Sequence, residues 1–126
     1  MKKLVMGLLF LALLSGCGKK QSVSFCEGVS LKGEGMRCGT TFSAGELTAM
    51  ISADENFGTD RLQITVFEKK KHTTVKVETL SIQVKPEERK ANANIGLYNE
   101  GFFNIKVFGK ENAVIAEGDV EIVDTY

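Results

Sequence analysis

The chain has 126 residues, of which 16 are basic and 16 acidic, so its formal net charge is zero. This length suits one folded domain and leaves no room for two. The even charge balance gives no electrostatic basis for binding nucleic acid, so we expect no nucleic-acid partner.

The N-terminus has the three parts of a secretory signal peptide. Lys2 and Lys3 supply positive charge, an apolar run follows over residues 4–14, and small residues occupy 15–16. A membrane-spanning helix needs roughly 20 apolar residues, so this run is too short to remain as a span. We therefore predict a signal peptide over residues 1–16 that is removed on export.

The sequence Leu14-Ser15-Gly16-Cys17 resembles the lipobox of bacterial lipoproteins. In that family a diacylglycerol is attached to the cysteine thiol, the chain is cut before the cysteine, and the new N-terminus is usually acylated. Two or more acyl chains anchor a protein stably in a membrane. The residue after Cys17 is Gly18, not the aspartate that commonly retains such proteins at the inner membrane. The resemblance therefore implies an envelope lipoprotein, lipidated at Cys17 and delivered to the outer membrane.

Two cysteines remain after Cys17, and they predict a disulfide. Cys26 and Cys38 lie in a chain expected to reach an oxidising compartment, where an even cysteine pair is typically bonded. Three glycines between them allow the chain to turn back. Closing a loop of this size stabilises a protein by roughly 3 kcal/mol on the chain-entropy model. The alternative, a redox or metal pair, lacks the Cys-x-x-Cys spacing, and the chain has a single histidine.

A short polar segment separates Cys17 from the predicted domain. We interpret residues 17–24 as a lipidated tether and residues 25–126 as the domain. Residues 43–57 are ambiguous, because Ser43 and Glu46 match a helix capping box while the apolar residues from Leu47 also alternate as in a strand. We favour a strand, since a glycine weakens the first helical turn and the surroundings are rich in strand patterns.

The middle of the chain predicts a hairpin. Apolar and polar residues alternate over 62–66 and again over 74–77, with the basic turn Lys69-Lys70-Lys71-His72 between them. The alternation then changes parity, which predicts a bulge or a strand break at Glu78-Thr79. Proline followed by acidic residues predicts one short helical turn over residues 86–91.

The C-terminal part predicts a second hairpin and completes the fold class. Residues 103–107 and 114–122 alternate around a polar turn at 109–112. About seven short strands with under about 10% helix indicate an all-β fold, an antiparallel β-sandwich. The last 30 residues also resemble the closing part of Ig-like domains of bacterial envelope proteins, with Gly101-Phe102-Phe103 opening the penultimate strand. The resemblance implies an Ig-like sandwich and carries no function by itself.

Two pairs of neighbouring apolar residues predict exposed side chains. Successive strand residues face opposite sides of a sheet. One of Phe102 and Phe103, and one of Val66 and Phe67, is therefore expected on an outer face, either as part of a contact surface or beside a bulge.

No pattern for nucleophilic, metal or phosphate chemistry is found in the sequence. His72 is the only histidine, and it lies beside three lysines in a predicted solvated turn. We therefore predict that the protein is not an enzyme and has neither a cofactor nor a metal site.

The leading hypothesis is a non-enzymatic binding or structural module whose partner is another envelope or extracellular protein. Recognition usually resides in loops on a rigid scaffold, and a disulfide lowers the cost of ordering such a loop. We predict a protein-contact surface within residues 27–37, carried by Lys32, Glu34 and Arg37. The alternative is that the disulfide only protects this loop from proteolysis.

A basic cluster adds a secondary prediction. Lys69, Lys70 and Lys71 are expected to make an electrostatic contact, or simply to keep a hairpin soluble and discourage edge-to-edge pairing. A second functional hypothesis is a small inhibitor of a host or competitor hydrolase. Periplasmic lysozyme inhibitors are also small, disulfide-bonded β lipoproteins, although their motifs are not found here.

Overall fold

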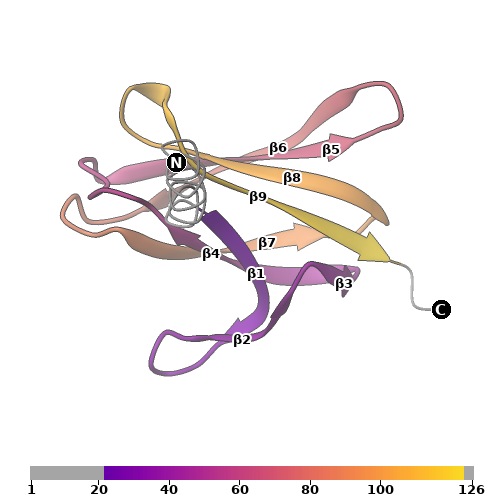
Figure 1. Cartoon of the computed structure of the whole chain (residues 1–126), viewed down its shortest axis with the longest axis horizontal. Helices are drawn as coiled ribbons and strands as arrows, with labels where there is room; N and C mark the ends of the chain where they lie inside the picture. The colour runs from indigo at the N-terminus through magenta and orange to yellow at the C-terminus, as the bar shows by residue number, and fades with distance from the viewer. Residues whose placement is uncertain (1–21, 124–126) are drawn as a thin grey trace, which may run out of the picture.

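The computed structural model describes residues 22–123, which form two packed β-sheets (Figure 1). The predicted signal peptide, the lipobox with Cys17 and residues 17–21 of the expected tether lie outside the described residues. Residues 22–24 of that tether belong to the first strand. Within residues 22–123, no helix is long and apolar enough to cross a membrane.

Nine strands and one short 3-10 turn make up the described chain. They are β1 (Ser22–Val29), β2 (Gly35–Gly39), β3 (Thr41–Ser43), β4 (Gly45–Ser52), β5 (Arg61–Lys69), β6 (Thr74–Gln83), β7 (Lys90–Leu97), β8 (Gly101–Phe108), η1 (Lys110–Asn112) and β9 (Val114–Val123). The smaller sheet has the order β2-β1-β4-β7 and the larger sheet the order β3-β9-β8-β5-β6. Every pairing is antiparallel except that of β3 with β9.

This arrangement confirms the predicted all-β sandwich. In Ig-like domains the first, second and fifth strands share one sheet, and the third, sixth and seventh share the other. Here β1, β4 and β7 are joined in the smaller sheet, and β5, β8 and β9 in the larger. The additional strands β2 and β3 lie between β1 and β4 in sequence. The sequence therefore predicted the layers and missed two short strands, whose residues show no clean alternation.

The core lies between the sheets and follows the two-residue period of the strands. Leu62, Ile64 and Val66 of β5 are fully buried, as their alternation predicted. The ambiguous segment is a strand, because β4 buries Leu47 and Ile51 on the same inner face. The helix capping pattern near Ser43 is overridden by this packing.

Two irregularities were predicted near β6, and one of those predictions is wrong. Val66 pairs with Glu78 and Phe67 with Lys76, so Val77 is the extra residue of a bulge just before the predicted position. The helical turn predicted over 86–91 is absent. The chain there makes a single turn, closed by a hydrogen bond from the Glu88 N–H to the Lys85 carbonyl (3.0 Å).

The extended path after that turn has a physical reason. Proline favours the second position of a β-turn as much as the first turn of a helix. The Arg89 carbonyl then accepts a hydrogen bond from the Ala53 N–H (2.8 Å), and Lys90 begins β7. Pairing with the chain that follows β4 therefore holds residues 89–91 extended, and the acidic residues after Pro86 remain in an exposed loop. The turn predicted over 109–112 is confirmed, with η1 inside it.

Candidate contact surface

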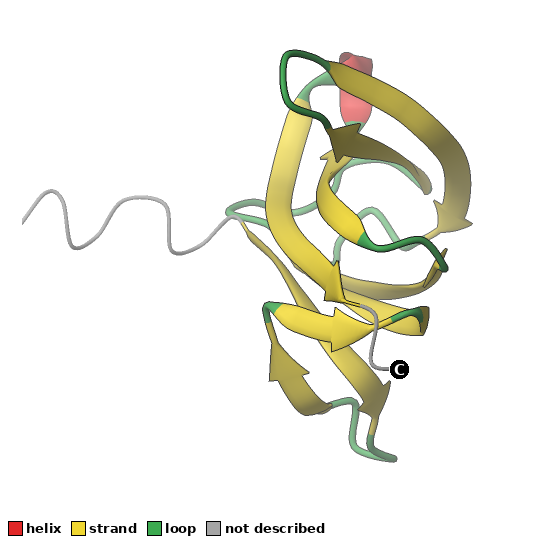
Figure 2. Ribbon diagram, turned by 90° about the vertical axis from the view of Figure 1, so that its right-hand side faces the viewer, coloured by secondary structure: helices red, strands yellow, loops and turns green. Residues whose placement is uncertain are grey.

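The main projection of the molecule is a two-stranded arm formed by residues 27–37. β1 pairs with β4 as far as Cys26, which lies opposite Thr48, and beyond that point its described pairing is with β2. All five residues of β2 are exposed. Figures 1 and 2 show this hairpin at the bottom of the molecule, where it projects beyond the rest of the smaller sheet. The predicted contact loop is therefore a ribbon that stands free of the core.

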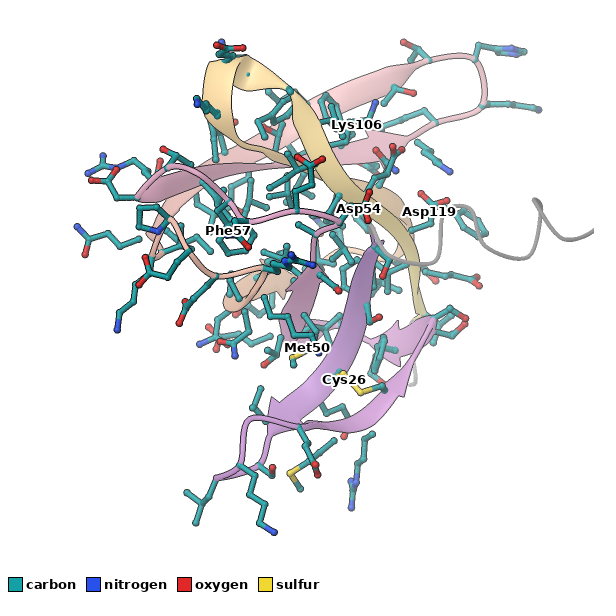
Figure 3. All side chains as sticks on the ribbon, turned by 60° about the vertical axis from the view of Figure 1, so that its left-hand side comes forward. Cys26, Met50, Asp54, Phe57, Lys106 and Asp119 are labelled. Atoms are coloured by element: carbon teal, nitrogen blue, oxygen red, sulfur yellow. A yellow bond between two sulfur atoms is a disulfide. The ribbon has the colours of Figure 1, made fainter. Side chains whose placement is uncertain are left out.

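The predicted disulfide is confirmed and closes the base of the arm. Cys26 and Cys38 are cross-strand partners, with Cα atoms 3.8 Å apart and a bond between their sulfur atoms. Figure 3 shows the bond beside the labelled Cys26, where the arm leaves the sheet. A Cβ atom on Gly35 would lie 2.5 Å from Cys26 Sγ and 2.6 Å from Cys38 Sγ. The disulfide thus packs directly against the backbone of Gly35, and a larger residue would not fit there.

The turn at the tip of the arm is held by its own hydrogen bonds. The Ser30 N–H donates to the Glu34 carbonyl (2.8 Å), and the Gly33 N–H donates to the Ser30 carbonyl (2.9 Å). The Ser30 hydroxyl oxygen accepts from the backbone N–H groups of Lys32 (3.2 Å) and Glu34 (3.1 Å). Gly33 has a φ of 84°, the left-handed conformation that closes a three-residue hairpin loop. The loop is therefore ordered before any partner binds.

This ordered turn presents apolar side chains to solvent. Leu31 is fully exposed at the tip, with a relative exposure of 107%, and Met36 on the flank has 50%. Sequence reasoning named the charged residues of this loop and missed both. A signal was available, since Leu31 is a lone large apolar residue in a stretch of turn-forming residues, with no strand alternation to give it a buried role.

The charged residues predicted on the arm lie around this tip. Lys32 and Glu34 are exposed beside Leu31. Arg37 has a φ of 55° and its Nη1 lies 3.5 Å from the Glu27 carboxylate across the arm. Both side chains of this ion pair are mostly exposed (81% and 53%), so it contributes little to stability. The structure therefore places the three predicted residues on one projection.

The predicted basic cluster lies elsewhere. Lys69 ends β5, with its Nζ 3.3 Å from Asp119, and Lys70 Nζ lies 3.6 Å from Glu68. Lys71 occupies the exposed turn that follows. The β5–β6 hairpin is at the top of Figures 1 and 3, whereas the arm is at the bottom, so the two predicted contacts do not form one surface. The two acidic partners also reduce the net positive charge of the hairpin.

The outer face of the larger sheet carries the expected exposed aromatic. Phe102 is 56% exposed while Phe103 is buried, and Val66 is buried while Phe67 is half-buried. Lys106 Nζ lies 5.6 Å from the centre of the Phe67 ring, a cation–π contact. The prediction that one member of each pair faces outward is confirmed.

A polar network covers the middle of that face. Asn104 is nearly buried, and its side-chain nitrogen donates hydrogen bonds to the carboxylates of Glu117 (3.1 Å) and Asp119 (2.8 Å). Asp119 also forms an ion pair with Lys69. The carboxylates are thus engaged by neighbouring donors, and in the described part of the chain no three His, Cys, Asp or Glu side chains gather as a metal site would require.

Comparison with known proteins gives no relative from which to transfer a function. No protein-family model matches the chain, and no curated protein matches it. The arm and the two sheets are therefore the features from which a function can be inferred.

Proposed function

We propose that this chain is an envelope lipoprotein, held in the outer membrane by lipid on Cys17, that binds another protein through its arm without catalysing a reaction. The observation that carries the proposal is the fully exposed Leu31 at the tip of a hydrogen-bonded, disulfide-closed hairpin. The partner is expected to be another envelope or extracellular protein.

Leu31 at the tip of the arm can supply binding energy. Moving a leucine side chain from water into a protein pocket gains roughly 2 kcal/mol. In a flexible loop, the cost of ordering the chain would offset much of that gain. Here the four hydrogen bonds around Ser30 and the disulfide at Cys26 fix the loop beforehand. An exposed apolar residue on such a support favours recognition over a purely protective role for the disulfide.

The position of the arm relative to the proposed anchor favours a protein over the anchoring membrane. Ser22 begins β1, and the tip of the arm follows the opposite end of the same strand, at Val29. Five residue steps join Cys17 to Ser22, which span at most roughly 18 Å when fully extended. The anchor therefore holds the start of β1 near the membrane, while the eight residues of β1 separate Leu31 from that point.

Site-specific photo-cross-linking in intact cells tests the proposal. A photoreactive residue replaces Leu31 in one strain and Val114 in another, because Val114 is also an exposed apolar residue (46%) but lies far from the arm in sequence, at the start of β9. We expect a discrete cross-linked protein from position 31 and none from position 114. No product at position 31, or the same product at both positions, would contradict the proposal.

A second candidate, inhibition of a host or competitor hydrolase, is favoured by the shape of the arm. A narrow two-stranded ribbon with an apolar tip has a form that can enter an enzyme cleft, as long binding loops do when they insert into concave sites. The direct test is to add the purified protein to assays of lysozymes of several types. Inhibition that is lost in Leu31→Ser would support this candidate, and unchanged activity of every enzyme would remove it for that class.

A further inference from the structure

The four strands at the sheet edges differ in how they are protected from pairing with another chain. Natural edge strands are blunted by shortness, bulges, charged residues or irregular backbone. β3 has three residues, β6 carries a bulge at Val77 beside Lys76 and Glu78, and β2 contains Arg37 at positive φ. β7 has none of these features beyond Lys90, its first residue.

β7 is instead a regular and open edge. All eight of its residues pair with β4 in unbroken register, and from Ala91 to Leu97 it contains no charged residue and no proline. In the described chain its pairing is with β4 alone, and it ends the strand order of the smaller sheet. Its outer edge is therefore available to another strand.

The alternation of hydrogen bonds identifies which groups of β7 face that edge. The Ala53 N–H donates to the Arg89 carbonyl at 2.8 Å, so these two residues form a hydrogen-bonded pair in line with the register of β4 and β7. Bonded and non-bonded pairs alternate along an antiparallel ladder. The backbone N–H and C=O groups of Asn92, Asn94 and Gly96 therefore point away from β4, and both asparagines are exposed.

Apolar side chains of β6 line the space beside the open edge of β7. Leu62 and Ile64 of β5 are fully buried, but their partners on β6, Ile82 and Leu80, are only half-buried. The smaller sheet thus covers β5 completely and β6 incompletely, so β6 extends beyond β7. A strand added to β7 would lie over Leu80 and Ile82 and complete their burial.

Because β6 extends beyond β7, a single strand fits beside β7 better than a second sandwich domain does. If a second copy of the domain paired through its own β7, its larger sheet would have to occupy the place of β6. A single extended segment has no second sheet and fits. A cavity of about 150 Å³ between Val77 of β6 and Gly96 of β7 marks the end of this space.

Charges on the outer face give the segment a direction. Lys90 begins β7, and Glu46 lies beside Gly96 near its end, where the Tyr98 hydroxyl donates to the Glu46 carboxylate (3.5 Å). The Tyr98 ring lies over Gly96, 2.6 Å from where a Cβ atom would be, so a neighbouring residue would meet the Glu46 carboxylate beside that ring. An antiparallel segment with a basic residue opposite Gly96 and an acidic residue opposite Lys90 is complementary to both ends.

We infer that β7 accepts an extended segment of a partner protein as a fifth strand of the smaller sheet. The segment runs antiparallel to β7, places apolar residues over Leu80 and Ile82, and carries a basic residue at its N-terminal end and an acidic residue at its C-terminal end. Gly33 of the arm lines a pocket of about 270 Å³ together with Lys90 and Asn92, but the peptide tests β7 and cross-linking at position 31 tests the arm, so each proposal can fail without the other.

The probe is an end-blocked peptide, KVTVTVE, in which the threonines lie opposite Asn92 and Asn94 and the valines face β6. It is added to the 15N-labelled full-length protein in detergent, and amide shifts are followed by NMR. We expect the largest changes at Asn92, Asn94 and Gly96. The reversed peptide EVTVTVK has the same composition but opposes like charges at both ends, and it should bind at least fivefold more weakly.

Backbone methylation provides a matched pair of control peptides. Among the five residues between the two ends of the peptide, only the threonines point their N–H groups at β7, so N-methylation of the threonines should abolish binding, while N-methylation of the valines should leave it within about threefold. Equal effects of the two modifications, or shifts centred on β2 or β3, would overturn the inference.

Substitution of Asn92 tests whether the backbone N–H groups of β7 bind the peptide. Asn92→Pro removes an N–H that points to the open edge, and Asn92→Thr keeps it. We expect the proline variant to lose at least tenfold in peptide affinity and the threonine variant to bind as the parent does. Equal binding by the two variants would contradict the inference, and if Asn92→Pro fails to fold, the methylated peptides still decide the question.

Discussion

Gly35 lies directly against the sulfur of Cys26, so close that a Cβ atom at position 35 would be 2.5 Å from Cys26 Sγ. The contact joins the two strands of the arm at the point where the ribbon leaves the sandwich. It makes the disulfide and the backbone of β2 a single packed unit, and this unit is the base from which Leu31 projects.

Gly35→Ala is therefore expected to destabilise the protein by about 1 to 3 kcal/mol, the usual cost of forcing an added methyl group into a packed site. The sulfur atoms cannot move freely because they are bonded to each other. Gly28→Ala is the matched control on the opposite strand of the arm, since its Cβ atom would meet nothing within 4 Å. Urea unfolding of both variants measures the difference, and equal stabilities would argue against this packing.

Removal of the disulfide should loosen the arm and lower stability. With Cys26→Ser and Cys38→Ser together, we expect a loss of up to about 3 kcal/mol on the chain-entropy model. Faster amide exchange at Ser30 and Gly33 should accompany it, because an isolated two-stranded ribbon is only marginally stable. Alkylation and mass spectrometry of protein taken from cells should find no free thiol, and two alkylated cysteines would contradict the bond.

A second glycine marks where the two sheets approach each other. A Cβ atom on Gly118 of β9 would overlap the carbonyl oxygen of Val23 in β1. Because that neighbour is backbone, Gly118→Ala should cost more than Gly35→Ala and lower the melting temperature by several degrees or more. Gly39→Ala, with open space around its Cβ atom, serves as the control. A thermal scan that places both variants at the parental melting temperature would refute the close approach.

Much of this fold could be predicted from the sequence, and the exceptions have local causes. The alternation in β5 identified Leu62 and Ile64 as core because a half-buried strand has a simple two-residue period. β2 escaped prediction because all of its residues are exposed, which leaves no apolar pattern. The prediction of a helical turn after Pro86 was wrong because Arg89 is held extended by a hydrogen bond from Ala53, a residue distant in sequence.

Some features of the candidate contact surface could also be predicted from the sequence, and others could not. The disulfide and the contact loop could be predicted from the cysteine count and the glycines between them. Leu31 had a weak signal, as a lone apolar residue among turn-forming residues, but Met36 had none, because its exposure depends on the direction in which the arm leaves the sandwich. The open edge of β7 depends on strand order, which the sequence does not contain in any local pattern.

The proposed anchor makes a prediction outside the described residues. Cys17→Ala should yield an unprocessed or soluble form, because the lipid is attached through that thiol in the family that the lipobox resembles. Detergent-phase partitioning and intact mass of the wild type and the variant measure this. Normal partitioning of the variant, with unchanged mass, would contradict lipidation at Cys17.

The most direct test of binding through the arm is the affinity of arm variants for the partner trapped by cross-linking at position 31. Leu31→Ser should weaken binding at least tenfold without changing the melting temperature, and exchange of Lys32, Glu34 and Arg37 for Ser together should weaken it further. Val114→Ser and the exchange of residues 69–71 for Ser should have smaller effects, because both lie away from the arm. Unchanged affinity in Leu31→Ser and in the triple variant would contradict the proposed role of the arm.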